Sequence, residues 1–149
     1  MEKLLLLHSL REVRQLLPSY FNLYQAILHR IRHQNFGVVE LAEGGDLSRC
    51  VVRLRQRKPE LWTVGEIRQI AEALNLPVAV CIKLEAELNR MGEALLVQPS
   101  RMYVSLLRVC GLHRLRSRVR LGDRWSYTDL YRLYQGTADE RLLRQPPEN

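Results

Sequence analysis

The sequence has little lysine, little cysteine and no long apolar run. Only three of its 23 basic residues are lysines, which leaves 20 arginines. The three cysteines, Cys50, Cys81 and Cys110, are odd in number and far apart, which argues against a disulfide framework and fits a reducing compartment. No apolar stretch approaches the roughly 18 residues that cross a bilayer, and the leucine run at 4–7 is too short for the core of a signal peptide. These absences argue against a membrane protein and a secreted scaffold, and they predict a cytoplasmic protein. The sequence also lacks a phosphate-cradling glycine loop and a complete set of metal ligands, so no cofactor or metal is expected.

What the sequence does have is an apolar core and an uneven excess of positive charge. Its 149 residues are 46% hydrophobic, enough for one ordinary domain or two very small ones, and its net charge is +7. The charge gathers in two windows. The first holds Arg49, Arg53, Arg55, Arg57 and Lys58 with no acid, and the second holds Arg108, Arg114, Arg116, Arg118, Arg120 and Arg124 against Asp123 alone. Two basic clusters predict two contact points on a polyanion, although each is also compatible with a solvated helix face.

Hydrophobic periodicity predicts an all-α protein. Apolar spacings of three and four indicate a helix over 2–17, which Pro18 is expected to end, and a second helix to about 33 that Ser19 can cap. Thr63 followed by Glu66 has the capping-box spacing at the start of another helix, and Ser126 is expected to cap the last one. The apolar run 78–82 is expected to be an extended connector. The helices that Thr63 and Ser126 cap are predicted over 64–75 and 127–135. Three further helices are predicted over 38–43, 83–96 and 100–109.

The two basic runs allow two interpretations. As helices, each would bury an apolar face at i, i+3 and i+7, which is Leu47, Cys50 and Leu54 in the first run. The second run has the same spacing at Leu112, Leu115 and Val119. Arginines alternate strictly with other, mainly apolar residues over 114–121 and partly over 52–57, which is the period of a strand. Two such strands would form a ribbon with arginines on one face. We favour helices because the flanking segments are helical, and for the second run the choice stays open.

The basic runs belong to two similar stretches of sequence. Leu47 precedes Trp62 by fifteen residues and Leu112 precedes Trp125 by thirteen, and a Thr or Ser follows each tryptophan at the start of a helix. Self-similarity of this kind is typical of a duplicated supersecondary unit. We therefore expect an all-α helical bundle with two tandem helix-turn-helix units. The expected boundaries are 1–80 for the N-terminal helix and first unit, 81–138 for a reduced second unit, and 139–149 for a frayed tail.

Residues 20–77 resemble the helix-turn-helix domains of the lambda-repressor/Cro-like family. The matching motifs are the short helix 41–43 (Leu-Ala-Glu), the turn 44–47 (Gly-Gly-Asp-Leu), the Ser48-Arg49 opening of a recognition helix, and the closing segment 66–77. The loop 57–61 lacks the glycine usual in the family, and 100–136 looks like a reduced second copy. The resemblance implies binding to double-stranded DNA through the helix that begins at Ser48.

The physical chemistry of the basic runs agrees with DNA binding. Arginine forks bind guanine edges and phosphates, and a glutamine such as Gln56 can bind adenine. We expect a sequence-specific regulator of transcription, bacterial or phage in type, that is nucleoid-associated and is not an enzyme. If it forms a homodimer, the N-terminal Leu-rich helix is the expected contact. The DNA-binding residues are predicted to be Ser48, Arg49, Arg53, Gln56, Arg57, Lys58, His113, Arg114, Arg116, Arg118 and Arg120.

The same residues allow other interpretations of the function and of possible sites. The protein could instead be a helical adaptor for an acidic protein partner, or an RNA or single-strand binder that stacks bases on Tyr127, Tyr131 and Tyr134. His29 and His33 have the spacing of metal ligands but lack a third ligand, so exposed histidines are expected. Cys110 and His113 make at most half a zinc site, while Cys50 and Cys81 are expected in the core.

Overall fold

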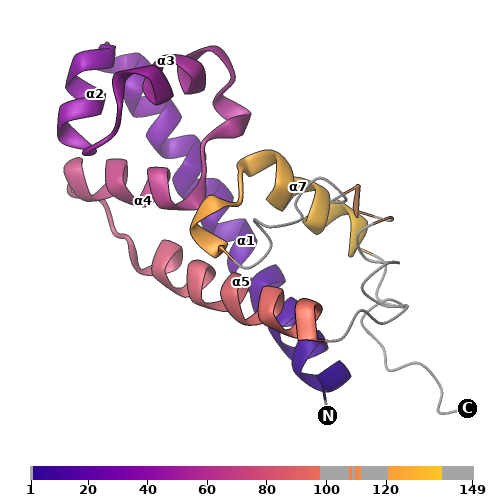
Figure 1. The fold of residues 1–149 in the computed structure, drawn as a ribbon. Helices are drawn as coiled ribbons and strands as arrows, with labels where there is room; N and C mark the ends of the chain where they lie inside the picture. Colours follow the sequence, from indigo (N-terminus) through magenta and orange to yellow (C-terminus); the bar gives the residue numbers. More distant parts are fainter. Residues whose placement is uncertain (1, 98–107, 109, 112–120, 139–149) are drawn as a thin grey trace, which may run out of the picture.

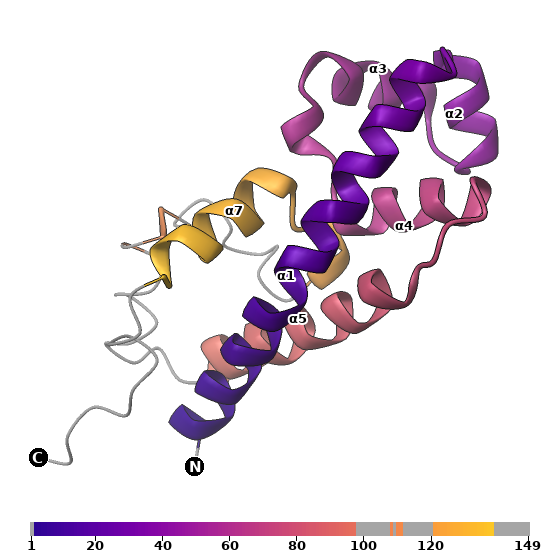
Figure 2. The same ribbon diagram turned by 180° about the vertical axis from the view of Figure 1, so that it is seen from behind.

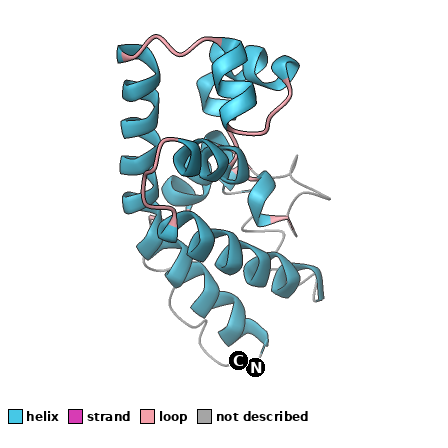
Figure 3. Cartoon of the chain, turned by 90° about the vertical axis from the view of Figure 1, so that its left-hand side faces the viewer, coloured by secondary structure: helices cyan, strands magenta, loops and turns pink. Residues whose placement is uncertain are grey.

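A computed structural model of the chain describes residues 2–97, 108, 110–111 and 121–138, and this part is an all-α bundle (Figure 1). Helices and loops account for all of it in Figure 3, and the one β-type pairing among the described residues is an isolated bridge between Thr63 and Ser126. The predicted all-α fold is therefore confirmed. The predicted helix 100–109, most of the second basic run and the tail 139–149 lie outside the described residues, as do His113, Arg114, Arg116, Arg118 and Arg120.

The bundle is organised around one long helix, α1 (Glu2–His33), which packs along α5 (Ala79–Val97) and extends to α2 and α3 at its far end (Figure 2). The predicted break at Pro18 and the predicted cap at Ser19 are wrong, because α1 continues through both residues. A proline inside a helix costs about 3 kcal/mol. Each large apolar side chain that α1 buries contributes roughly 1.5–3 kcal/mol, and the buried stripe outweighs the proline. Its members are Leu6, Leu10, Val13, Leu17, Tyr20, Tyr24 and Ile27.

The helix α5 also differs from its prediction, because it begins at Ala79 and no extended connector is present at 78–82. The amide of Ile82 already donates to the carbonyl of Val78 at 3.1 Å. Cys81, Leu84 and Leu88 are fully buried at i, i+3 and i+7, so the apolar run supplies the first turns of a helix that packs on α1.

The helices α2 (Val38–Gly44) and α3 (Arg49–Arg57) are joined by a tight turn that both helix ends define. Asp46 takes the left-handed conformation with φ 52°, and the amide of Leu47 donates back to the carbonyl of Ala42 at 2.8 Å, which closes the end of α2. The Ser48 hydroxyl then accepts from the amide of Val51 at 3.1 Å, so the predicted cap of α3 is confirmed.

Two segments far apart in the sequence have the same local structure. In each, a 3₁₀ turn leads to a buried tryptophan and then to a helix that begins with a capping box. The first consists of η1 (Pro59–Leu61), Trp62 and α4 (Val64–Ala73), and the second of η3 (Gly122–Arg124), Trp125 and α7 (Tyr127–Gly136). The predicted caps Thr63 and Ser126 are both confirmed, since each hydroxyl accepts from the amide three residues later.

These two segments also pair with each other by an exchange of hydrogen bonds. The amide of Val64 donates to the carbonyl of Trp125 at 3.0 Å, and the amide of Tyr127 donates to the carbonyl of Trp62 at 3.2 Å. Around this pairing, one buried apolar cluster runs from Leu6 in α1 to Leu133 in α7. The exchange joins the two segments by reciprocal hydrogen bonds within one buried apolar cluster.

Candidate nucleic-acid interface

The orientation of α3 differs from the one that the sequence predicted. Val52 is fully buried against the core, whereas Cys50 is exposed and 56% of Leu54 is accessible to solvent. The predicted apolar face of Leu47, Cys50 and Leu54 is therefore wrong beyond Leu47, and Cys50 is not a core residue. The strand interpretation of 52–57 is also wrong, because this segment is helical.

The outward face of α3 carries a row of cations. Arg49, Arg53 and Arg57 are exposed and spaced four residues apart, so their side chains lie on one face of the helix. Lys58 is exposed at the C-terminal end of the helix, and α3 itself contains no acidic residue. Among the described residues, none of these four cations has an ion pair. The row thus keeps its charge available to an external anion.

Arg55 belongs to the same basic run but has a different position and partner. Its Nε donates to Oε1 of Glu66 at 2.8 Å and its Nη2 to Oε2 at 3.4 Å, in a fork that joins α3 to the first turn of α4. The same Oε1 also accepts from the amide of Thr63 at 3.0 Å, so the capping box and the ion pair share one carboxylate. Arg55 therefore fixes how α3 sits on the core, and it leaves the outward row to the other cations.

An apolar pair lies beside the cationic row. Cys50 and Leu54 are one helical turn apart and exposed. Cys50 lies three residues before Arg53 and Leu54 lies three residues before Arg57, so each is next to one arginine on the helix surface. Sequence reasoning missed this pair because it assigned both residues to the core. A signal was available, since Leu47, Val51 and Val52 also form an apolar stripe at helical spacing, and Glu66 follows Arg55 closely enough to pair with it.

The ends of the two similar helices are held by arginines of α1. Nη1 of Arg30 donates to the carbonyl of Leu74 at 3.2 Å, at the end of α4. Nη1 of Arg14 donates to the carbonyl of Tyr134 at 2.6 Å, near the end of α7, and its guanidinium lies 4.6 Å from the centre of the Tyr134 ring. Cations at helix C-termini are favourable because the last carbonyls lack partners within the helix. α1 therefore holds the ends of both α4 and α7.

The aromatic residues of α7 pack mainly on one another and on α1. Tyr127 stacks on Tyr24 at 4.3 Å between ring centres and lies parallel to Tyr131 at 6.0 Å, while Phe21 meets Tyr127 and Tyr134 edge to face. Tyr127 and Tyr134 are half-buried and Tyr131 is exposed, as expected for the core and rim of this unit. Burial is the main cause that raises the pKa of Tyr24 well above its usual range, and Tyr24 donates its hydroxyl to the carbonyl of Pro59.

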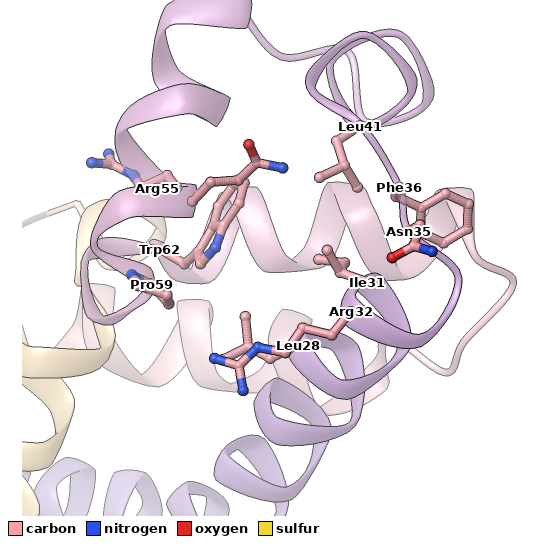
Figure 4. Close-up of a pocket in the computed structure, with 10 residues that line it drawn as sticks. Leu28, Ile31, Arg32, Asn35, Phe36, Leu41, Arg55, Pro59 and Trp62 are labelled. Atoms are coloured by element: carbon pink, nitrogen blue, oxygen red, sulfur yellow. The ribbon is translucent and has the colours of Figure 1, made fainter.

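A hollow of about 430 Å³ opens behind α3, between the end of α1, α2 and η1 (Figure 4). Its walls are about half apolar and include Leu28, Ile31 and Leu41, with the buried Trp62 on one side. Arg32 and Gln56 also line it. Gln56, which the sequence assigns to DNA contact, is exposed and so borders both this hollow and the outer surface of α3.

The described residues hold no group of three or more His, Cys, Asp or Glu side chains arranged to bind a metal ion. His29 and His33 are exposed as expected, with ring centres 4.2 Å apart. Cys81 and Cys110 are buried, while His113 lies outside the described part of the chain. In the helices that the structure describes, none is both long and apolar enough to cross a membrane.

No family model, curated protein or solved structure matches this chain. The resemblance to the lambda-repressor/Cro-like family thus depends on the motifs within 20–77 alone. Of the predicted site residues, the part of the chain that the structure describes contains Ser48, Arg49, Arg53, Gln56, Arg57 and Lys58, all of them in or next to α3.

Proposed function

We propose that this protein binds double-stranded DNA in a sequence-specific way and regulates transcription, with α3 as its recognition helix. The observation that carries the proposal is the division of the first basic run. Val52 and Arg55 fix the inner side of α3 to the core, and the outer side presents exposed cations beside two exposed apolar residues.

The shape of the α2–turn–α3 unit supports binding in the major groove. A recognition helix must protrude, be capped at its N-terminus and be held from behind, and α3 has the Ser48 cap, the buried Val52 and the forked ion pair from Arg55. An α-helix with its side chains is about 10–12 Å across, which suits a major groove about 12 Å wide.

The cations divide into two roles in this proposal. Arg49 and Arg53 lie on the exposed row toward the N-terminal half of α3, where side chains reach base edges, and arginine binds the O6 and N7 of guanine with two hydrogen bonds. Lys58 lies after the last turn and is placed to contact phosphate, which adds affinity without sequence preference.

The second basic run would add a second reading surface on the same chain. Arg114, Arg116, Arg118 and Arg120 are its proposed contacts, as the sequence predicts. Two linked surfaces raise the effective concentration at the second half-site, so each can be weak alone. A homodimer through α1 stays a prediction, and it would need residues other than Leu10 and Leu17, which are buried in this chain's own core.

Selection of bound duplexes from a random pool tests the proposal most directly. We expect an enriched motif, and two spaced half-sites if both basic runs read DNA. A mobility-shift series over salt concentration with a random duplex is the accompanying control. No binding to duplex DNA even at low salt would contradict the proposal and favour an acidic protein partner instead, and preference for single strands or duplex RNA would favour the other alternative.

Two single substitutions separate base contact from phosphate contact. Arg53→Ala is expected to weaken binding and relax the sequence preference, whereas Lys58→Ala should weaken all sequences alike and reduce the salt slope by about one unit. Lys83→Ala, at an exposed lysine of α5, serves as the control for loss of one charge. Affinity is measured on the selected duplex and on a scrambled one. If Arg53→Ala and Lys58→Ala behave identically on both duplexes, direct reading by Arg53 is wrong.

A further inference from the structure

The hollow behind α3 contains polar groups without partners. Trp62 lines the hollow, and its indole N–H has no hydrogen-bond partner among the described residues, although this nitrogen is not itself sealed from solvent as the unpaired indole nitrogen of Trp125 is. Arg32 reaches across the opening from α1, and no ion pair or hydrogen bond of its guanidinium exists within the described residues. Arg32 is exposed, so its guanidinium and the indole N–H of Trp62 are two donors that a ligand in the hollow can reach.

The rest of the lining sets the chemistry of such a ligand. Leu28, Ile31 and Leu41 offer apolar surface, and Phe36 adds an aromatic wall. The volume of about 430 Å³ lies within the usual range of small-molecule sites, which combine apolar walls with a few placed polar groups. Arg55 also lines the hollow, but Glu66 already engages its guanidinium, so Arg32 is the cation that can receive an external anion.

We propose that this hollow binds a small organic anion with an apolar body, of the chemical class of aromatic carboxylates. The carboxylate would pair with the guanidinium of Arg32, an oxygen of the ligand would accept the indole N–H of Trp62, and the apolar body would cover Leu28 and Ile31. Arginine suits this task because its planar fork matches both carboxylate oxygens.

Occupation of the hollow would also oppose DNA binding, an effect that rests on the proposed function. Gln56 borders the hollow and also belongs to the surface of α3. A Gln56 side chain that turns to the ligand is not available to a base. The negative charge of the ligand behind α3 also repels the phosphates that the arginine row attracts. Both effects act in the same direction and lower the affinity for duplex DNA.

The binding step is tested without DNA, on the full chain, by the two indole N–H signals in a ¹H–¹⁵N correlation spectrum. The chain has two tryptophans, so Trp62→Phe assigns both signals at once. Benzoate, phenylacetate and 4-phenylbutyrate are titrated to millimolar concentrations, and phenylacetamide serves as the neutral counterpart. Arg32→Gln removes the proposed anion partner, and Lys83→Gln removes an exposed cation on α5 as the matched control.

We expect at least one of these carboxylates to shift the Trp62 signal to saturation and leave the Trp125 signal in place. Arg32→Gln should raise the Kd of that carboxylate about tenfold, leave the Kd of phenylacetamide unchanged, and differ from Lys83→Gln in this respect. No shift of the Trp62 signal by any of the carboxylates, equal shifts of both indole signals, or equal affinity in Arg32→Gln would overturn the site.

A second measurement separates the site from its effect on DNA. The affinity for the selected duplex is determined with and without a saturating carboxylate, and we expect a severalfold loss in wild-type protein and none in Arg32→Gln. Unchanged affinity in wild-type protein with the Trp62 signal fully shifted would overturn the coupling alone. If no duplex binds at all, the proposed function is wrong, while the indole titration still decides the ligand site.

Discussion

Leu54 is 56% exposed although the sequence predicted it on the buried face of α3, and folding gains little from it. An exposed leucine alone is ordinary on protein surfaces. Leu54, however, lies one turn from the exposed Cys50 and next to Arg53 on the surface proposed to enter the major groove. Apolar side chains in that groove contact the C5 methyl group of thymine, while neighbouring arginines bind guanine. In the proposed complex, the pair would therefore add a specificity that the arginines alone do not supply.

Replacing Leu54 by alanine tests this contact. We expect wild-type protein to lose about fivefold in affinity when uracil, which lacks the methyl group, replaces the contacted thymine in the selected duplex, a difference of about 1 kcal/mol. Leu54→Ala should bind the two duplexes equally and keep the thermal stability of wild-type protein. Leu61→Ala, at an exposed leucine outside α3, is the control. Full discrimination against uracil by Leu54→Ala would refute the contact.

The three cysteines are expected to differ in reactivity toward a thiol reagent at pH 8. Cys50 is exposed, whereas burial is the main cause that raises the pKa of Cys81 and of Cys110 to about 11. The thiolate is the reactive form, so the two buried thiols react slowly at pH 8 and faster only as the pH approaches 11. Ellman's reagent should therefore label one thiol rapidly in native protein, none in Cys50→Ser, and the others on unfolding. Rapid labelling of a second thiol would contradict the orientation of α3 or the burial of the other two.

At the scale of residues, the sequence predicted a feature correctly where neighbouring residues alone determine that feature. Ser48, Thr63 and Ser126 cap their helices as predicted, because a cap needs only a hydroxyl and a nearby amide. The rotation of α3 was predicted wrongly, because Leu47 fits two apolar stripes. The partner that decides between them is Glu66, which lies on another helix.

At the scale of the elements, α1 shows how packing overrides a local signal. Pro18 is exposed in the interior of a helix of 32 residues, and sequence reasoning predicted two helices there. The buried residues on each side of it, Leu17 and Tyr20, continue one stripe that packs on α5. The same effect extends α5 back to Ala79, since isolated runs of four or five apolar residues do not distinguish a strand from the first turn of a helix.

Pro18→Ala is expected to stabilise the protein. The substitution restores a backbone N–H and removes the ring that crowds the preceding turn. We expect the free energy of unfolding to rise by about 2 kcal/mol, since the helix gains about 3 kcal/mol and the unfolded chain gains freedom worth up to about 1 kcal/mol. Urea unfolding followed by circular dichroism measures the change. Pro77→Ala, at an exposed proline between α4 and α5, should bring no gain. A Pro18→Ala variant no more stable than wild-type protein would mean that α1 is not continuous in solution.

At the scale of the whole molecule, the two tryptophan segments and α5 meet at a close approach of backbone. Gly122 donates its amide to Oδ1 of Asn89 at 2.7 Å, and an added Cβ would lie 2.5 Å from the carbonyl oxygen of Glu85 and 2.9 Å from the Cβ of Leu88. Similarity within the sequence indicated the two segments, but it did not reveal that η3 lies against α5, because that contact joins residues more than thirty positions apart.

Gly122→Ala therefore should destabilise the whole fold. The new methyl group cannot avoid the carbonyl of Glu85 without moving η3 away from α5, and overpacking of this kind costs about 1–3 kcal/mol. Gly37→Ala is the matched control, because nothing lies within 4 Å of its added Cβ. The difference between the two variants in thermal unfolding measures the effect. Equal unfolding temperatures would show that η3 does not rest on α5 as described.

The reciprocal bonds between Val64 and Trp125 and between Tyr127 and Trp62 have the form of an isologous interface, in which each side offers the other the same groups. In a homodimer, one mutation alters both sides of such an interface at once. Here both sides are encoded in one chain, so they can diverge independently. The two sides already differ at Gly65, which lies close to Asp123, and at the corresponding Thr128, whose hydroxyl donates to the carbonyl of Glu60.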